Sequence, residues 1–351
     1  MDGVRRGKGG QGKKSEKNEV WDMIIIGGGP TAVGAGVYAA GQKLRVLVIT
    51  EDFGGQSTVS SSIRNWVGIK EIAGLELAKM LEDHLRAQEG VRIKQPERVR
   101  AVREKSGREF GKEGCLFEVE TEGGDTYHSK TVTIASGAKH RELGVPGEKE
   151  LQGKGVAYCS TCDAFFYAGK KVVVVGSGNS ALETVLDLAV NNAKEIYLLI
   201  RSPHTKGSLV NREKVERLPQ VKIILNVVVT EVVGESEVTG VRYKSKVDGT
   251  VGELAVDGIF VAIGSKPNTE MVRGLVEMNE DGEIFIDHET ARTSKKGIFA
   301  GGDATKTKHK QNNVGAAHGL LAALSAYEYL SNIELHSPCA EREDQDEDAA
   351  A

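Results

Sequence analysis

The stretch that decides the fold of this chain is Met-Ile-Ile-Ile-Gly-Gly-Gly-Pro-Thr-Ala, at residues 23–32. An apolar strand runs straight into Gly27-x-Gly29-x-x-Ala32, and the small residues of segment 30–40 predict a helix after it. In a strand–turn–helix unit of this kind, the first glycine permits a tight turn and the second lets the backbone approach a pyrophosphate. The free N–H groups at the helix start favour phosphate there. The stretch therefore predicts a dinucleotide-binding α/β unit.

A second unit of the same design lies at residues 172–181, Val-Val-Val-Val-Gly-Ser-Gly-Asn-Ser-Ala, with Gly176 and Gly178 at the two glycine positions. Segment 179–190 is predicted as its helix, and segment 195–200 as the strand that follows. Two such units predict two dinucleotide-binding domains of common design in an α/β fold, with one dinucleotide bound to each.

The chain between these units and after them follows the same α/β pattern. Segment 74–88 is predicted as an amphipathic helix with Leu75, Leu77, Ala78, Leu81 and Leu85 turned inward. Strands are predicted at 20–26, 45–49, 91–102, 116–120, 131–135, 221–233, 238–246 and 254–263. A hairpin loop is predicted at 103–114, and a strand, a turn and a long helix are predicted within 297–332.

The residue that follows the second strand differs in charge between the two units. Glu51, 24 positions after Gly27, is placed to accept hydrogen bonds from a ribose hydroxyl. Arg201, 25 positions after Gly176, puts a base at the corresponding place, with Lys206 as a second cation nearby. Because a base there favours a ribose 2′-phosphate, the second site is predicted to take NADPH in preference to NADH. The alternative, a solvated Arg201 and an NADH-dependent site, stays open.

Cys159-Ser-Thr-Cys162 ends fourteen positions before the second glycine turn. This spacing brings two thiols to adjacent turns near a helix start, where one thiolate is stabilised and the pair can close to a disulfide. Asp163 follows at once and is a candidate proton carrier. A zinc site is the alternative, but zinc needs four ligands and the chain has no second such pair. Two dinucleotides and a dithiol imply electron transfer from one cofactor through the other to a disulfide. Cys115 and Cys339 are isolated in the sequence.

The bulk composition excludes several classes of protein. The 351 residues carry a net charge of −4 and 5% aromatic residues, which argues against nucleic acid or an anionic membrane as a partner. No apolar run reaches the roughly 18 residues that span a bilayer, and no signal peptide precedes residue 20, so a cytoplasmic protein is expected. Segment 1–19 is basic and segment 336–351 is acidic, and both are predicted to be disordered tails.

Taken together, these motifs resemble the low-molecular-weight thioredoxin reductases. The resemblance covers residues 20–332 and is carried by 159–167 (Cys-Ser-Thr-Cys-Asp-Ala-Phe-Phe-Tyr), 54–56, 65–66, 135–138, 301–303 and 310–312. It implies two Rossmann-like domains of the three-layer ββα kind. An FAD domain would be discontinuous, at 20–142 and 268–335, with an NAD(P)H domain at 143–267 inserted between its parts and carrying the dithiol.

The resemblance also assigns roles to individual residues. It implies that Cys162 is the thiol nearest the flavin, that Cys159 attacks the partner disulfide, and that Asp303 binds the flavin side chain. The FAD site would comprise Gly27, Gly29, Pro30, Thr31, Ala32, Glu51, Gly55, Gln56, Asn65, Val99, Ala135, Gly137, Gly302, Asp303, Lys310, Gln311 and Asn312. The NADPH site would comprise Gly176, Ser177, Gly178, Asn179, Ser180, Glu183, Arg201, Lys206, Ile263 and Gly264. No metal is expected. Members of the family are homodimers whose two domains rotate against each other.

The activity implied is thioredoxin-disulfide reductase, in which a hydride passes from NADPH to FAD and electrons then reach the dithiol and oxidised thioredoxin. One alternative is the NADH-dependent flavoprotein of a peroxide-reducing system. That flavoprotein normally carries thioredoxin-like modules before its flavin domain, so a separate small dithiol protein would then be required. A second alternative is an FAD-dependent dithiol oxidase, for which a degraded second glycine turn would be expected. A third is a redox-sensing protein that only binds the two nucleotides.

Overall fold

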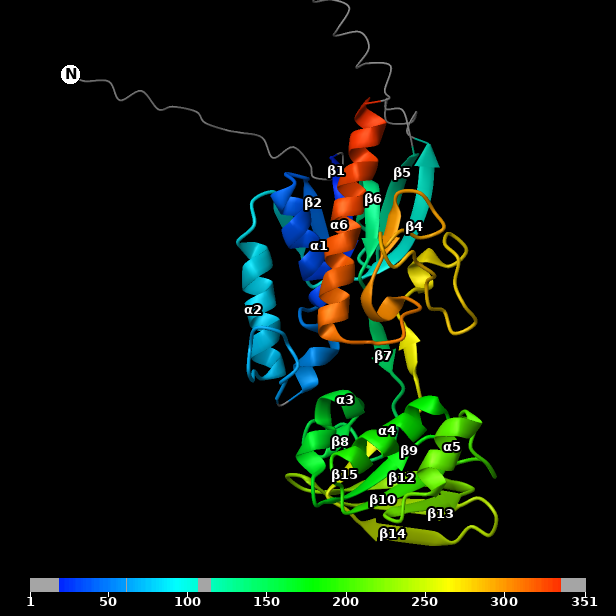
Figure 1. Ribbon diagram of the computed structural model, residues 1–351. Coiled ribbons are helices and arrows are strands. Elements are labelled where there is room, and N and C mark those ends of the chain that lie inside the picture. The colour runs from blue at the N-terminus through cyan, green and yellow to red at the C-terminus, as the bar shows by residue number, and fades with distance from the viewer. Residues whose placement is uncertain (1–18, 61, 107–114, 336–351) are drawn as a thin grey trace, which may run out of the picture.

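The computed structural model describes residues 19–60, 62–106 and 115–335, which form two bodies, each built on its own sheet (Figure 1). We call the part with β1–β6, β17, α1, α2 and α6 the first body, and the part with β8–β15 and α3–α5 the second body. A two-stranded ribbon joins them. The predicted tails, segment 107–114 of the predicted hairpin loop and Cys339 lie outside the described residues.

The sheet of the first body has the strand order β3-β2-β1-β6-β5-β4, and β17 also pairs with β6. Strands β1, β2, β3 and β17 run parallel to their neighbours, whereas β4–β5 and β5–β6 are antiparallel. The strands are β1 (Val20–Ile26), β2 (Val46–Ile49), β3 (Val91–Lys94), β4 (Val99–Ser106), β5 (Cys115–Thr121), β6 (Thr126–Ile134) and β17 (Ile298–Ala300). The helices are α1 (Pro30–Gly41), α2 (Gly74–Arg86) and α6 (Asn312–Leu335), with short 3₁₀ turns η2 (Gly55–Val59), η5 (Glu270–Val272) and η6 (Gly302–Ala304).

Small residues let α1 and α6 pack against each other with their backbones in contact. A Cβ on Gly319 would lie 2.1 Å from the carbonyl oxygen of Thr31, and one on Gly34 would lie 2.5 Å from that of Ala316. Any larger side chain at these positions would push the helices apart. This close crossing fixes the start of α6 beside the first glycine turn, at the lower end of the first body in Figure 1.

The second body has the parallel sheet order β11-β10-β9-β15-β8 and a separate antiparallel sheet, β12-β13-β14. Its strands are β8 (Val156–Ala157), β9 (Lys171–Val175), β10 (Glu195–Ile200), β11 (Val221–Leu225), β12 (Val227–Gly234), β13 (Val238–Ser245), β14 (Val251–Ala255) and β15 (Gly258–Val261). Its helices are α3 (Ser160–Asp163), α4 (Asn179–Val190) and α5 (Leu209–Glu216), and the 3₁₀ turn η4 (Ala164–Tyr167) follows α3.

The valine run of β9 explains the three layers of this body. Val172 and Val174 pack with α4 residues such as Leu182 and Val185. Val173, on the opposite face, packs with β12 and β13 through residues such as Val241. A strand buried on both faces needs an uninterrupted apolar sequence rather than an alternating one. The predicted α/β fold class, with two dinucleotide-binding units of the ββα kind, is confirmed.

The ribbon consists of β7 (Ala138–His140) and β16 (Ser265–Pro267), which pair in antiparallel fashion. The chain leaves the first body through β7 and returns through β16, and β17 then joins β6. The second body is thus inserted within the sequence of the first. The predicted domain boundaries at 142/143 and 267/268 fall next to the ribbon and stay predictions.

Several predicted elements differ from the structure. Leu75 is 69% exposed and not turned inward, because it lies in the first turn of α2 on the face opposite Leu77 and Leu81. The predicted strand 221–233 is split at Asn226, whose φ of 56° turns the chain from one sheet to the other. Segments 91–102 and 254–263 likewise each contain two strands, and α5 was not predicted.

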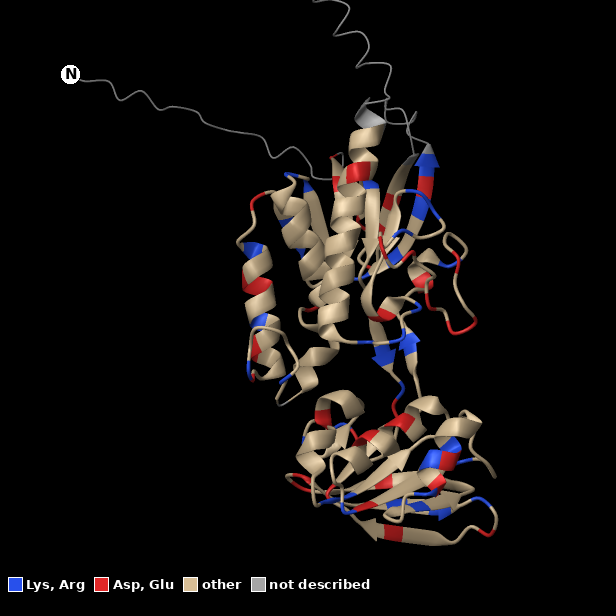
Figure 2. Ribbon diagram, in the orientation of Figure 1, with Lys and Arg blue, Asp and Glu red and all other residues tan. Residues whose placement is uncertain are grey.

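Charged residues of both signs lie interspersed over both bodies (Figure 2). Many are paired locally, as Lys79 with Asp83 on α2 and Arg103 with Glu120 between β4 and β5. None of the described helices is long and apolar enough to cross a membrane.

Candidate active site between the two bodies

The first glycine turn has the geometry that a pyrophosphate site requires. Gly27 has a φ of 126°, and a Cβ there would lie 2.2 Å from the carbonyl oxygen of Ala135, which follows β6. Gly29 differs, because a Cβ there would meet no described atom within 4 Å. Gly29 is also the N-cap of α1, and no side chain caps that helix. Free N–H groups facing open space fit a bound phosphate.

The second glycine turn repeats this geometry. Gly176 has a φ of 151°, and its Cβ would lie 2.3 Å from the carbonyl oxygen of Ala262, which follows β15. Gly178 faces open space and is the N-cap of α4, again with no side-chain cap. Both turns therefore fit a dinucleotide pyrophosphate, one on each body.

Strands β1, β6 and β17 of the first body all end at the first turn. Ala135 and Gly137 follow β6, and Gly302 follows β17. The Gly302 N–H donates to His318 Nδ1 at 3.2 Å, and a Cβ on Gly302 would lie 2.4 Å from Thr31 Oγ1. The predicted residues Gly27, Gly29, Pro30, Thr31, Ala32, Gly55, Ala135, Gly137 and Gly302 thus gather at the carboxyl edge of this sheet, where ligands of α/β sheets bind.

Glu51 lies at the same edge, after β2, and has a partner that the sequence did not reveal. Arg98 Nε donates to Glu51 Oε2 at 2.6 Å, and its Nη2 reaches the same oxygen. Val99, the next residue, begins β4. The predicted ribose acceptor is therefore oriented by a guanidinium that lies 47 residues away in the sequence.

Lys310 is fixed just before α6. Its Nζ donates to the carbonyl oxygens of Asp303, at 3.0 Å, and Thr305, at 3.2 Å, and pairs with Glu283 Oε1 at 2.9 Å. Burial would raise the pKa of Glu283, but hydrogen bonds and charge from Lys310 and neighbouring residues lower it. Burial raises the pKa of Asp303, although the charge of Lys310 opposes that shift. Sequence reasoning did not find Glu283, which lies in an irregular segment with no motif.

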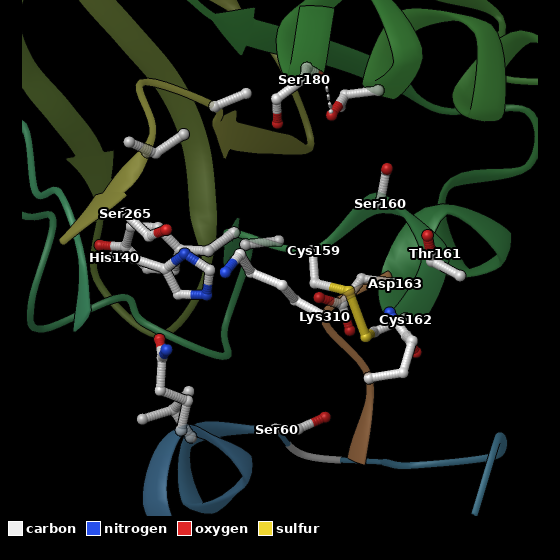
Figure 3. Close-up of a pocket in the computed structure, with 18 of the residues that line it drawn as sticks. Ser60, His140, Cys159, Ser160, Thr161, Cys162, Asp163, Ser180, Ser265 and Lys310 are labelled. Atoms are coloured by element: carbon white, nitrogen blue, oxygen red, sulfur yellow. Dashed lines mark hydrogen bonds between the residues drawn. A yellow bond between two sulfur atoms is a disulfide. The ribbon is translucent and has the colours of Figure 1, made fainter. Parts of the chain in front are cut away.

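A cavity of about 500 Å³ lies between the bodies (Figure 3). Predicted residues from both bodies line it, namely Gln56, Asn65, Asp303, Lys310, Gln311 and Asn312 from the first body and Cys159, Cys162, Asp163, Ser180, Glu183 and Gly264 from the second. In Figure 3 the Lys310 side chain lies between His140 and the cysteines in this view, and Ser180 lies on the other side of the cavity. The cavity therefore joins the dithiol to the start of α4 and to the start of α6.

Arg201 and Lys206 do not line this cavity. They belong to the loop after β10, which folds over the second turn through a 2.6 Å hydrogen bond from the Lys206 N–H to the Ser177 carbonyl oxygen. Asn179 Oδ1 accepts from the Ser208 N–H at 2.7 Å and closes the loop. Both cations are exposed, and the loop that carries them lies on the second turn. Ile263 follows β15 and packs against the buried cluster of the second body that contains Val173.

The predicted thiol pair is a disulfide between Cys159 and Cys162, with a Cα–Cα distance of 5.3 Å. Cys159 is the N-cap residue of α3, as its spacing predicted. Burial raises the pKa of Asp163 to about 6, which suits a group that exchanges protons near neutral pH. Ser160 Oγ donates to Asp187 Oδ2 at 2.6 Å, so the segment between the cysteines is held to α4.

A second group that sequence reasoning missed holds the residue before Cys159. The Tyr158 ring stacks on His140 with centroids 5.2 Å apart and an interplanar angle of 12°. The Tyr158 hydroxyl donates to Glu148 Oε1 at 3.0 Å. Glu148 is fully buried and also accepts from the N–H groups of Leu143 and Gly144. Burial lowers the pKa of His140, which therefore favours its neutral form in the cavity.

A disulfide placed between two dinucleotide turns defines a class of protein, the nucleotide-dependent disulfide oxidoreductases. The sequence pattern of the family described as "Pyridine nucleotide-disulphide oxidoreductase" matches residues 21–319. The chain belongs to this family, which implies FAD and a nicotinamide nucleotide as cofactors.

Solved structures confirm the resemblance to thioredoxin reductases. The thioredoxin reductase of Streptococcus pyogenes MGAS5005 is 32% identical and superposes with a TM-score of 0.82 over 90% of this chain and 99% of that chain. The thioredoxin reductase of Lactococcus lactis in its FR conformation is 30% identical and superposes with a TM-score of 0.59 over 89% of this chain and 99% of that chain.

Curated relatives carry other names. An alkyl hydroperoxide reductase subunit of Pseudomonas putida is 39% identical over 321 residues, which are 91% of this chain and 60% of that protein. A protein of Bacillus subtilis (strain 168) named NADH dehydrogenase is 36% identical over 327 residues, 93% of this chain and 62% of that protein. The chain thus spans less than two thirds of the length of these relatives.

Proposed function

We propose that this chain is a thioredoxin-disulfide reductase that takes electrons from a nicotinamide nucleotide through FAD and passes them to the disulfide of a thioredoxin-like protein. The observation that carries the proposal is the Cys159–Cys162 disulfide in one cavity with Asn65, Lys310 and Asn312. This chain matches the solved thioredoxin reductase of Streptococcus pyogenes over nearly the whole length of that protein, which supports the same activity.

The residues of the chain have distinct tasks in this proposal. Bound FAD would supply two-electron transfer between nicotinamide and disulfide. The first glycine turn and Glu51 would bind FAD at its pyrophosphate and ribose, and Asn65 and Lys310 would orient it beside the cysteines. Cys162 would be the sulfur nearest the flavin, and Cys159 the sulfur that attacks the partner's disulfide. Asp163 would give and take the proton as thiol and thiolate exchange.

We propose NADPH as the donor. Arg201 and Lys206 are exposed on the loop that folds over the second turn, where a ribose 2′-phosphate would meet two cations. The open space at Gly178 and the uncapped start of α4 support nucleotide binding at this turn. An intact second turn also argues against a dithiol oxidase that makes no use of nicotinamide.

A second candidate function is the flavoprotein of a peroxide-reducing system, with NADH as donor. What favours it is the 39% identity to the alkyl hydroperoxide reductase subunit of Pseudomonas putida, together with the relative that is named NADH dehydrogenase. The redox centre would work in the same way, and the difference would lie in the nucleotide and in the dithiol partner.

The test is anaerobic mixing of the FAD-loaded chain with NADPH and, separately, with NADH, while flavin absorbance is followed. Faster bleaching with NADPH, lost in Arg201→Ala, supports the first candidate. Faster bleaching with NADH supports the second. If neither nucleotide bleaches the flavin, both candidates fail, and a dithiol oxidase or a redox-sensing binding protein takes their place.

Oxidised thioredoxin and the thioredoxin-like module of a peroxide-reducing system should then be compared as electron acceptors. Turnover with thioredoxin, abolished in Cys159→Ser, supports the reductase. Turnover with the module alone supports the second candidate. We also propose a homodimer in the cytoplasm, from the resemblance to the family. Sedimentation of a species with twice the mass of one chain would support the dimer, and a monomer would contradict it.

A further inference from the structure

Arg64 is a cation that reaches from the first body to the second. Its guanidinium carbon lies 5.1 Å from the centroid of the Phe165 ring and 5.4 Å from that of the Phe166 ring. Both distances lie within the range of a favourable cation–π contact. Phe165 and Phe166 belong to η4, the turn that follows Cys162 and Asp163 directly. A side chain of the first body therefore holds the segment that carries the disulfide.

The loop that presents Arg64 is fixed on its own body. Ile63 is buried and exchanges two backbone hydrogen bonds with Ile72, of 2.8 and 3.0 Å, which close the loop. Asn313, at the start of α6, donates from Nδ2 to the Asn65 carbonyl oxygen at 2.6 Å. The neighbours of Arg64 on both sides are thus anchored, one in the core and the other on α6.

The side chain of Arg64 is also oriented before it meets the rings. Its Nη2 donates to Glu71 Oε1 at 3.1 Å, and the same oxygen accepts from Ser62 Oγ at 2.6 Å. The pair is about half exposed, so its own contribution to stability is small. Its effect is to direct the guanidinium toward η4.

The two rings form a matching surface. The centroids of Phe165 and Phe166 are 4.1 Å apart with planes tilted by 41°, and Phe166 also packs against the core of the second body. A second contact between the bodies lies at Gly153, where a Cβ would come within 2.6 Å of the Val59 carbonyl oxygen of η2. Val59, Gly153 and Phe166 all line the cavity, so two contacts flank it.

Solved relatives differ in how well they superpose on this chain as a whole. The thioredoxin reductases of Streptococcus pyogenes and Lactococcus lactis match this chain at 32% and 30% identity and nearly equal coverage, yet their TM-scores are 0.82 and 0.59. A side chain of one body can touch the other body only in some of their relative arrangements. The arrangement of this chain, with the disulfide against the first body, is one in which Arg64 reaches the rings.

We propose that Arg64 is a positioning residue, which holds the disulfide segment against the FAD side of the cavity through its charge on Phe165 and Phe166. This inference rests on the proposed function. The contact favours electron transfer between flavin and disulfide and is lost whenever the second body turns away. In that transfer bound FAD, once reduced, would supply two electrons and a proton, and the Cys159–Cys162 bond would break. One sulfur ends as a thiol and the other as a thiolate.

The test compares wild type, Arg64→Ala, Arg64→Lys and Glu71→Gln as full chains loaded with FAD. Glu71→Gln is the matched control, because it removes the charge of Glu71 but keeps a side-chain oxygen that can accept from Arg64 Nη2, and it keeps the cation that contacts the rings. The first measurement is amide hydrogen exchange, which needs no catalysis. Peptides covering 159–167 should exchange about three- to tenfold faster in Arg64→Ala, as expected from loss of a cation–π contact. Peptides covering β9 and α4 should not change, Arg64→Lys should lie between, and Glu71→Gln should match wild type.

The second measurement is a single turnover with less than one equivalent of nicotinamide nucleotide, followed by flavin absorbance. Recovery of the absorbance after bleaching, which reports transfer to the disulfide, should slow by a similar about three- to tenfold in Arg64→Ala. The bleaching step itself should not slow, because the nucleotide binds on the second body.

Exchange and recovery within about twofold of wild type in Arg64→Ala would overturn the proposal. So would an equal effect of Glu71→Gln, since the charge of Glu71 and not the ring contact would then matter. Failure of the proposed function would look different. Wild type itself would show no bleaching or no recovery, while the exchange measurement would still decide whether Arg64 holds the disulfide segment.

Discussion

At the scale of single residues, the site depends on groups whose surroundings set their chemistry. Asp163 carries the same carboxyl group as any surface aspartate, yet burial beside the disulfide raises its pKa to about 6. Glu148 is fully buried, and its carboxyl oxygens accept from three donors, the N–H groups of Leu143 and Gly144 and the Tyr158 hydroxyl. Both residues lie within fifteen positions of the cysteines in the sequence.

Asp163→Asn should slow reduction of the Cys159–Cys162 disulfide by about a hundredfold, the usual contribution of a positioned proton donor. The protonated carboxyl gives the proton to a leaving sulfur, so the wild-type rate should fall as pH rises through about 6, its raised pKa. The variant should show no such transition in a stopped-flow pH profile. A rate unchanged by the substitution would contradict the role.

The stability of this variant serves as its control. Between the ordinary pKa of 3.8 and the raised value near 6, the native state binds a proton that the unfolded chain has lost. Stability from this group is therefore present at low pH and is lost as pH rises through 6. At pH 7 Asp163→Asn should be at least as stable as wild type, which separates loss of rate from loss of fold.

Glu148→Ala should lower the free energy of unfolding by about 3 kcal/mol, because it leaves two part-buried N–H groups and the Tyr158 hydroxyl without their acceptor. Denaturant unfolding of the FAD-loaded chain measures this. Glu148→Gln keeps one acceptor oxygen and should cost about half as much. Equal stability of Glu148→Ala and wild type would show that water satisfies these donors.

At the scale of elements, each glycine turn combines two glycines with different tasks. The first glycine of each pair faces the carbonyl oxygen of a neighbouring strand end, so a side chain there is excluded by the fold. The second faces open space, so a side chain there is tolerated by the fold and excluded only by a ligand. Substitution can therefore separate folding from binding.

Gly178→Val should fold and retain FAD but raise the dissociation constant for the nicotinamide nucleotide at least about tenfold, because the added methyl groups occupy the approach of the pyrophosphate. Gly29→Val is the matched variant and should lose FAD while the chain stays folded. Nucleotide titration and the flavin absorbance of the purified chains measure both. Nucleotide affinity unchanged in Gly178→Val would remove this turn as the site.

At the scale of the whole molecule, the two bodies touch through the ribbon, the Gly153 contact and Arg64, and the cavity lies between them. A cofactor bound to the first turn of the native state and not to the unfolded chain stabilises the first body by mass action.

Adding FAD to the FAD-free chain should therefore raise the thermal midpoint. At a hundredfold excess over the dissociation constant the gain is about 2.7 kcal/mol. Gly29→Val should show no gain under the same conditions, as followed by circular dichroism. A midpoint that does not depend on FAD in the wild type would count against the first turn as its site.

Prediction from sequence succeeded where the signal was local. Both strand–turn–helix units, the position of Cys159 at a helix start and the disulfide itself follow from residues within ten positions of each other. Leu75 shows the limit of local prediction. Helical periodicity predicts which face of a helix is apolar, but it does not predict whether another element covers the ends of that face. The split at Asn226 shows another, since an asparagine in an apolar run is typical of a turn but does not tell which sheet each half of the run joins.

Local sequence was enough to predict two dinucleotide turns and a redox-active thiol pair, because glycine conformations and thiol spacing act over a few residues. The contacts of Glu51 with Arg98, of Lys310 with Glu283, and of Arg64 with Phe165 and Phe166 became visible only in the folded chain. These pairs join segments tens to more than a hundred residues apart in the chain. Their meeting depends on how the sheets, the ribbon and the α1–α6 crossing place whole bodies in space, and no local pattern of residues encodes that placement.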